Sequence, residues 1–163
     1  MVLLTACSFR KEWACGGENQ IVIKKNKMAT RSVIAKLDDK GIQAIYCHND
    51  GYLSNNGKIL DQHYANEVKV DNLIAQGDCS SLKDTIEDTI FYHRDKGDCY
   101  EGVKAVNLNN ETKLLEHAFE TCDAELVYMF AYGSWYVYDN ANTIGNCSYH
   151  YIELEEALYN IPV

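Results

Sequence analysis

The chain has 163 residues, a formal net charge of −9 and a charged fraction of 24%. This length predicts one domain, large enough to bury a single hydrophobic core. The negative charge repels phosphates and argues against direct binding to DNA or RNA, and no apolar stretch approaches the length of a transmembrane helix.

Residues 1–27 differ in charge from the rest of the chain. They hold five of the 15 basic residues and two of the 24 acidic ones, so the remaining 10 basic and 22 acidic residues give residues 28–163 a net charge of −12. Met28 then opens a segment that reads like a fresh start. We interpret residues 1–27 as an N-terminal extension that need not belong to the functional chain, and residues 28–163 as a single α+β domain.

Seven cysteines are present, and their number is odd. No two of them have the C-x-x-C spacing of a compact metal site. We therefore expect no metal and no cofactor, and we expect the reduced, mostly buried thiols of a cytoplasmic protein. The seven are Cys7, Cys15, Cys47, Cys79, Cys99, Cys122 and Cys147.

A β-hairpin is predicted near the start of the domain. Residues 32–37 have strand composition, residues 38–41 have the chemistry of a tight turn, and residues 42–47 form the return strand. Side chains alternate between the two faces of a strand. One face of the return strand therefore carries Ile42, Ala44 and Tyr46, and the other carries Gln43, Ile45 and Cys47.

Helices are predicted after this hairpin. Residues 57–64 suit a short helix, and Asn66 can cap a second helix that runs to about Gln76, where Gly77 stops it. Residues 81–84 resemble a weak capping box and predict one or two further helical turns. The second helix is expected to bury Val70, Leu73 and Ile74.

The next part of the chain contains two predicted strands and a helix. Residues 89–93 and residues 103–108 have strand composition, and a charged loop at residues 94–98 separates them. A helix that Asn110 can cap is predicted to end near Thr121.

The last part of the chain contains its clearest hairpin. Residues 125–138 are rich in aromatic and β-branched side chains and turn at Gly133. An amphipathic helix over residues 149–160 closes the chain. Together the elements predict an α+β fold with an antiparallel sheet of about four to six strands and helices packed mainly on one face.

The stretch from Tyr46 to Tyr52 is the densest cluster of reactive residue types. His48 and Asp50 share a face if the strand persists, so Asp50 could orient His48 as a carboxylate orients a general base, and His63 could add a second imidazole. Cys47 points to the other face and cannot easily chelate one ion together with His48. The alternative is structural, a strand-ending turn at Asp50-Gly51.

A charged loop supplies the other candidate residues. Arg94 and Lys96 could recognise a phosphate or a carboxylate, although Asp95 and Asp98 partly cancel their field. The alternative is a solvated connection held by local salt bridges. We take as candidate binding residues, around one polar pocket, His48, Asp50, His63, Arg94 and Lys96, and we assign no catalytic residue and no metal ligand.

Several short motifs follow one another along residues 28–163 and leave residues 1–27 outside. In their order they resemble a group of small proteins of tailed bacteriophages and prophages. This group has no established activity, so the resemblance transfers no catalytic residue. One departure lies at Asn49, where Trp is usual in the group. The motifs are Thr30-Arg31-Ser32, Tyr46-Cys47-His48-x-Asp50-Gly51-Tyr52, Gly57-Lys58-x-Leu60, His63-Tyr64, Asp78-Cys79-Ser80-Ser81-Leu82, Tyr92-x-Arg94-Asp95-Lys96-Gly97, Leu126-Val127-Tyr128-x-Phe130 and Trp135-Tyr136-Val137.

The resemblance implies an accessory protein that works in the cytoplasm of a host bacterium. We expect it to bind a host protein, with a role in counter-defence or host takeover, and to be non-enzymatic, with no direct contact to nucleic acid or membrane. One alternative is a small-ligand-binding or metal-dependent protein that uses the polar pocket. Another is a minor component of the virion.

Overall fold

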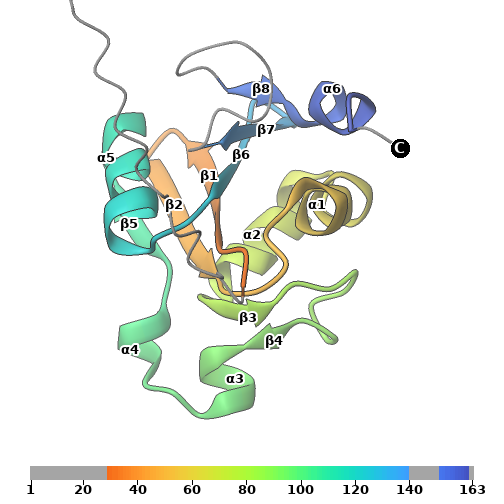
Figure 1. Cartoon of the computed structure of the whole chain (residues 1–163). Helices are drawn as coiled ribbons and strands as arrows, with labels where there is room; N and C mark the ends of the chain where they lie inside the picture. Colours follow the sequence, from red (N-terminus) through yellow and green to blue (C-terminus); the bar gives the residue numbers. More distant parts are fainter. Residues whose placement is uncertain (1–28, 140–150, 162–163) are drawn as a thin grey trace, which may run out of the picture.

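The computed structural model describes residues 29–139 and 151–161, which fold around one mixed β-sheet (Figure 1). The strand order is β4-β3-β2-β1-β6-β7-β8, and β5 pairs with β2 beside this path. Pairing is parallel between β1 and β6 and between β2 and β3, and antiparallel between the other neighbours. The strands are β1 (Ser32–Asp38), β2 (Gly41–Cys47), β3 (Cys79–Ser81), β4 (Ile90–Phe91), β5 (Val106–Leu108), β6 (Leu126–Ala131), β7 (Ser134–Asp139) and β8 (Ile152–Glu153).

This sheet confirms the α+β class and corrects the expected architecture. The described residues form eight strands instead of four to six, and two of the strand pairs are parallel. A parallel pair joins segments that lie far apart in the sequence and needs a long crossover connection. No turn motif marks such a pair, so the sequence pattern suggested an antiparallel sheet.

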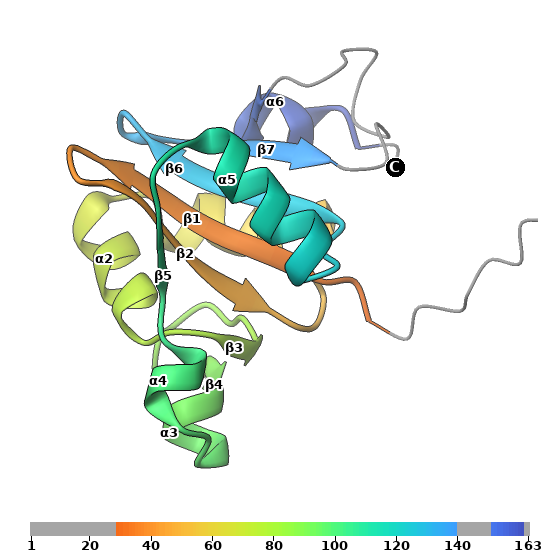
Figure 2. The same cartoon turned by 90° about the vertical axis from the view of Figure 1, so that its left-hand side faces the viewer.

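Helices cover both faces of the sheet. The helices α1, α2 and α6 pack on one face, where Leu60, Leu73 and Leu154 meet Ile34 and Tyr128. On the other face, α5 and the turn after it bury Leu114 and Ala118, and Figure 2 shows α5 lying across that face. The helices are α1 (Lys58–His63), α2 (Glu67–Ala75), α3 (Tyr92–Lys96), α4 (Tyr100–Val103), α5 (Glu111–Glu116) and α6 (Leu154–Tyr159), with π-helical turns η1 (Leu53–Gly57) and η2 (His117–Thr121).

The elements with strong local signals lie where the sequence predicts them. Both hairpins form, β1 with β2 and β6 with β7. The side chain of Asn66 accepts a hydrogen bond from the backbone N–H of Lys69, and Asn110 accepts one from Lys113, so both predicted N-caps are confirmed. The predicted core residues of α2 are buried as well.

Two predicted elements are wrong. No helix follows Ser81, because Ser81 belongs to β3 and pairs with Ile90 of β4. The charged loop predicted at residues 94–98 is largely helical, since α3 runs to Lys96 and ends at Gly97. In both places a contact with a distant or neighbouring segment overrides a weak local pattern.

Three further elements have different bounds from those expected. The strand predicted at residues 89–93 is reduced to β4, and the strand predicted at residues 103–108 is reduced to β5, after the short helix α4. The closing helix is α6, preceded by β8, and residues 149–150 lie outside the described residues, as do residues 1–27 and Met28. Within the two described ranges, no helix is long and apolar enough to cross a membrane.

Candidate functional site

The outer edge of β2 is shared by two strands. β5 pairs with residues 42–44 in an antiparallel sense, and β3 pairs in a parallel sense at Cys47 only. The backbone N–H of Tyr46 lies between these two pairings. It donates a hydrogen bond of 2.8 Å to Oδ1 of Asp78, so a side chain replaces the missing strand partner. We call this place the strand fork.

A cleft of about 920 Å³ opens at the strand fork. Tyr46 and Asp78 line it together with Arg31, the segment that joins α4 to β5, and residues from η2 to Asp123. Small-molecule sites in proteins usually have volumes of roughly 300–1,000 Å³. The cleft therefore has the size of a ligand site.

Backbone contacts fix the wall of the cleft at Asp78. The N–H of Asp78 donates a hydrogen bond of 2.6 Å to the carbonyl of Val103, next to α4. Gly77 precedes it with a φ of +80°, and a Cβ there would lie 2.3 Å from the same carbonyl oxygen. Only glycine combines this conformation with so close an approach. Asp78 is thus held between the end of α2 and the α4 segment.

Most of the charges in the cleft are paired with one another. Arg31 forms an ion pair with Asp123, and Lys104 forms one with Glu101. Asp78 is different: among the residues that the structure describes, no basic side chain forms an ion pair with it. Burial raises the pKa of Asp78 to about 6, although the hydrogen bond from Tyr46 opposes the shift.

Three further side chains of the cleft, Tyr46, Cys122 and His117, are neutral at pH 7. Burial raises the pKa of Tyr46 to about 12. It also raises the pKa of Cys122 to about 11, with a further contribution from the nearby charge of Asp78. His117 lies 3.4 Å from the Cys122 sulfur, between Nε2 and Sγ, and burial lowers the pKa of His117. No activated nucleophile results, because a nucleophilic thiol needs a depressed pKa.

Two of the five predicted site residues reach the same short strand beside this cleft. His48 bonds to Tyr46 through its ring, with 2.7 Å between Nδ1 and the hydroxyl oxygen, and its backbone N–H donates to the carbonyl of Cys79. Lys96 donates from Nζ to Oγ of Ser80 at 3.1 Å. The strand β3 therefore links His48 and Lys96.

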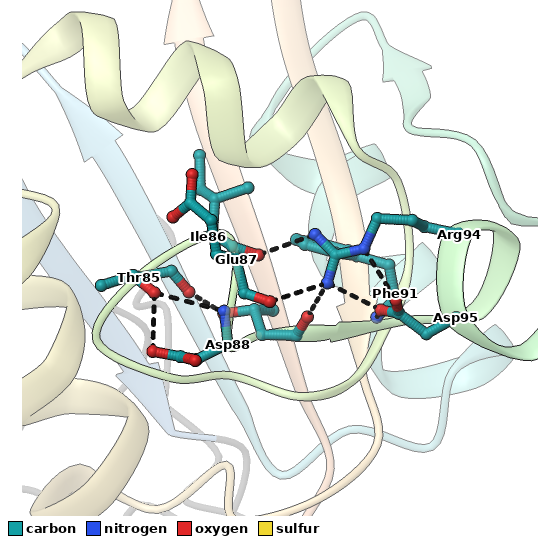
Figure 3. A network of polar contacts seen from close by, with 8 residues as sticks. Thr85, Ile86, Glu87, Asp88, Phe91, Arg94 and Asp95 are labelled. Carbon is teal, nitrogen blue, oxygen red and sulfur yellow. Dashed lines mark hydrogen bonds and ion pairs between the residues drawn. The ribbon is translucent and has the colours of Figure 1, made fainter.

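The other three predicted site residues have structural contacts of their own. Asp50 has a φ of +57° and its carbonyl accepts a hydrogen bond from the backbone N–H of Asn56, where the chain passes from β2 to η1. His63 ends α1 and lies 3.7 Å from Asp84, between Nε2 and Oδ1. Arg94 points back into the turn between β3 and β4, where it donates to three backbone carbonyls (Figure 3).

A pair of buried thiols lies behind the cleft, on the other face of the sheet. Cys47 and Cys79 are register partners on β2 and β3, and both are fully buried. The side-chain amide of Asn56 donates to the Cys47 sulfur at 3.3 Å. A hydrogen bond between the thiols lowers the pKa of Cys47, while the same neighbour and burial raise the pKa of Cys79. Cys47 has no exposed surface from which a dissolved substrate could be attacked.

Sequence reasoning missed most of the cleft. Tyr46 carried a usable signal, because strand alternation places it on the same face as His48. Asp78 begins one of the motifs that carry the resemblance but was not predicted as a site residue, and His117 and Cys122 carried no signal, since the three meet only through the fork and the packing of η2. Among residues 29–139 and 151–161, no group of three or more His, Cys, Asp or Glu side chains is arranged to hold a metal ion.

No protein-family model, curated protein or solved structure matches the chain. Function is therefore inferred from the geometry of the cleft.

Proposed function

We propose that this protein acts by binding, without catalysis, and that the cleft at the strand fork holds a small polar ligand. The observation that carries the proposal is the cleft itself, which has a volume of about 920 Å³ and a carboxyl group, a phenol and an imidazole in its lining. Ligand sites of this size use a few fixed polar groups to orient the bound molecule. Tyr46 and Asp78 are such groups, because the bond from the Tyr46 N–H fixes the carboxyl group of Asp78, and the ring of His48 fixes the Tyr46 hydroxyl.

The ionisation of the lining favours binding over covalent catalysis. The pKa values of Tyr46 and Cys122 are raised, to about 12 and about 11, so both side chains keep their protons at neutral pH. Neither side chain is therefore a nucleophile, which would need the ionised form. The biological setting that we propose follows from the resemblance described above: an accessory protein of tailed phages and prophages in the bacterial cytoplasm.

A variant with a large side chain at the rim of the cleft tests this proposal. Gly102 lines the cleft, and a Cβ added there meets no atom within 4 Å, so Gly102→Phe adds a bulky ring at this position. A fragment library screened by protein-observed NMR should give ligands that shift the amides of Tyr46, Asp78 and Val106 in the wild type and not in Gly102→Phe. The matched control is Val68→Phe, since Val68 on α2 is 69% exposed. Ligands that bind Gly102→Phe as well as the wild type would refute the cleft as the site.

Binding to a host protein is the second candidate function. It is favoured by two tyrosines that stand almost fully in solvent, Tyr132 at 91% and Tyr159 at 89% exposure, on a molecule with a net charge of −9. Exposed aromatic side chains are frequent anchors of protein interfaces. Affinity capture from bacterial lysate should retain a specific protein that Tyr132→Ser or Tyr159→Ser releases and Gly102→Phe does not. Identical captures with all these variants would rule out both tyrosines as contacts of the partner.

A further inference from the structure

The cleft holds five formally charged side chains, and four of them neutralise one another in pairs. Arg31 pairs with Asp123, and Lys104 pairs with Glu101. The fifth is Asp78, whose described partner is a backbone N–H. A carboxylate in a partly buried site is stable when a cation or several donors meet it. In the described part of the chain, the Asp78 carboxylate accepts a hydrogen bond from one backbone N–H and forms no ion pair. No positive side chain there neutralises its charge.

From this charge distribution we infer that the ligand of the cleft is cationic and that it places an amine or guanidinium group against Asp78. The inference rests on the proposed function, since it names the ligand class for the same cleft. An ammonium or guanidinium group supplies the positive charge that the cleft lacks, and it supplies donors for both carboxylate oxygens. An anionic ligand would instead meet an unneutralised negative charge at the strand fork.

The four titratable groups that bond to Asp78 or feel its charge carry no positive charge. They are Tyr46 on β2, Cys79 on β3, Tyr92 on α3 and Cys122 after η2, and each has a raised pKa. The basic side chains nearby have other partners. Arg31 bonds to Tyr46 and pairs with Asp123. On α3, Arg94 pairs with Asp95, and Lys96 donates to Ser80.

The remaining titratable groups of the cleft do not alter this picture. On α4 and beside it, Glu101 and Lys104 are occupied with each other. His117 on η2 is kept neutral at pH 7 by its lowered pKa. The ring of Tyr46 adds an aromatic surface, and such rings attract cations.

This arrangement predicts a pH dependence for binding. Asp78 has a pKa of about 6 in the free protein, and a cation binds its ionised form. Protons therefore compete with the ligand as the pH falls through that value, and well below it the affinity falls roughly tenfold per pH unit. Protonation of His117 at low pH would add a repelling positive charge and would act in the same direction.

Isothermal titration of the full chain with defined probes tests the inference. The probes are agmatine, a capped tripeptide with a central arginine, succinate as an anion, and acetamide as a neutral molecule. We expect agmatine or the tripeptide to bind at pH 7.5 and to lose tenfold or more in affinity at pH 5.0. The substitution Asp78→Asn should cause a loss of similar size at pH 7.5, whereas Asp39→Asn, in the exposed turn between β1 and β2, should not.

The arms of the experiment separate the possible outcomes. Tighter binding of agmatine assigns the cation to a free small molecule, and tighter binding of the tripeptide assigns it to a basic side chain of a protein; either result supports a cationic group. Binding of succinate or acetamide that Asp78→Asn leaves unchanged overturns the cationic class and leaves the ligand cleft standing. If no probe and no fragment shifts the amides around the cleft, the proposed function fails, and this inference fails with it.

Discussion

Asp78 has two roles at the strand fork, and they make opposite demands on its charge. Its carboxylate accepts the hydrogen bond of the Tyr46 N–H, which no strand pairs, and this bond favours the ionised form. Burial favours the neutral form and is the larger of the two effects, so the pKa rises to about 6. The side chain is thus poised to change its charge just below neutral pH, at the wall of the cleft.

The raised pKa makes stability depend on pH in a defined direction. The folded pKa of about 6 exceeds the ordinary value of 3.8, so the folded state holds the proton more tightly than the unfolded state does. This contribution to stability is complete below pH 3.8 and is lost as the pH rises through 6. Asp78→Asn keeps an oxygen acceptor for Tyr46 and never ionises.

We therefore expect Asp78→Asn to raise the Tm relative to the wild type at pH 7.5, and we expect the difference to shrink toward pH 4. Thermal unfolding followed by circular dichroism across this range measures it, with Asp39→Asn as the control. A difference in Tm that stays constant with pH would show that Asp78 does not titrate in this window.

Gly51 is a glycine whose position is predictable from the sequence but whose packing is not. The sequence predicts a turn at Asp50-Gly51. In the structure β2 ends at Cys47, the chain bends at Asn49, and Asp50 has a positive φ of +57°. The sequence gives no sign of the close packing of Gly51 against the start of β1. A Cβ on Gly51 would lie 2.8 Å from both the Ser32 Cβ and the Thr30 carbonyl oxygen, and the hydroxyl of Tyr128 donates to the Gly51 carbonyl at 2.7 Å. Glycine is required by packing against the start of β1, which is a contact between distant segments.

At the level of elements, α3 and the turn before β4 hold each other in place. Arg94 on α3 spreads its guanidinium group over the carbonyls of Ile86, Glu87 and Thr89 and over the carboxylate of Asp95 (Figure 3). It also lies above the ring of Phe91, 5.0 Å from the centroid. The planar fork of arginine allows several such bonds at once. Arg94, which the sequence suggested as a ligand for phosphate or carboxylate, therefore has its guanidinium group bonded within the protein.

Removal of this guanidinium group should loosen the turn more than the rest of the molecule. We expect Arg94→Met to accelerate amide exchange at Lys83 and Thr89, whose N–H groups are bonded within the turn. The global cost should be about 1 kcal/mol, or roughly 2–4 °C in Tm, because the site is partly solvated.

Hydrogen exchange read by NMR checks this prediction, with Lys104→Met as a control that also removes an ion-paired base from an exposed side chain. If exchange accelerates equally throughout the sheet, Arg94 contributes to global stability and does not serve as a local clamp.

The elements also show which parts of a fold a sequence pattern can predict. Hairpins and capped helices depend on residues close in the chain, and the signals at Asn66, Asn110 and Gly133 all produced the expected structures. The short strands β4 and β5 lie within the longer strands predicted at residues 89–93 and 103–108, whereas β3 and β8 were not predicted, because they are too short to show a period. The pairing of β3 and β5 with the same edge of β2 forms the fork and the cleft, and no local pattern signals it.

Across the whole molecule, the sheet separates two hydrophobic cores, which different helices cover. One core lies beneath α1, α2 and α6, and the other lies beneath α5. The central strands β1 and β6 contribute to both, as Val33 and Ile34 illustrate by pointing to opposite faces. The sequence predicts helices mainly on one face of the sheet. This agrees with α1, α2 and α6, but α5 and η2 lie on the other face, beside the cleft.

The second core should be as necessary for folding as the first. Leu114 of α5 is fully buried against β1, β2 and β6, and Leu73 of α2 is fully buried on the other face. A buried Leu→Ala substitution removes apolar contacts and leaves a cavity, which costs about 2–5 kcal/mol. We therefore expect Leu114→Ala and Leu73→Ala to lower the free energy of unfolding by similar amounts in urea denaturation. Val68→Ala, at a position that is 69% exposed, should change it by about 0.5 kcal/mol or less. A cost below about 1 kcal/mol for Leu114→Ala alone would mean that α5 is a dispensable cover, and the η2 wall of the cleft would then be free to move with it.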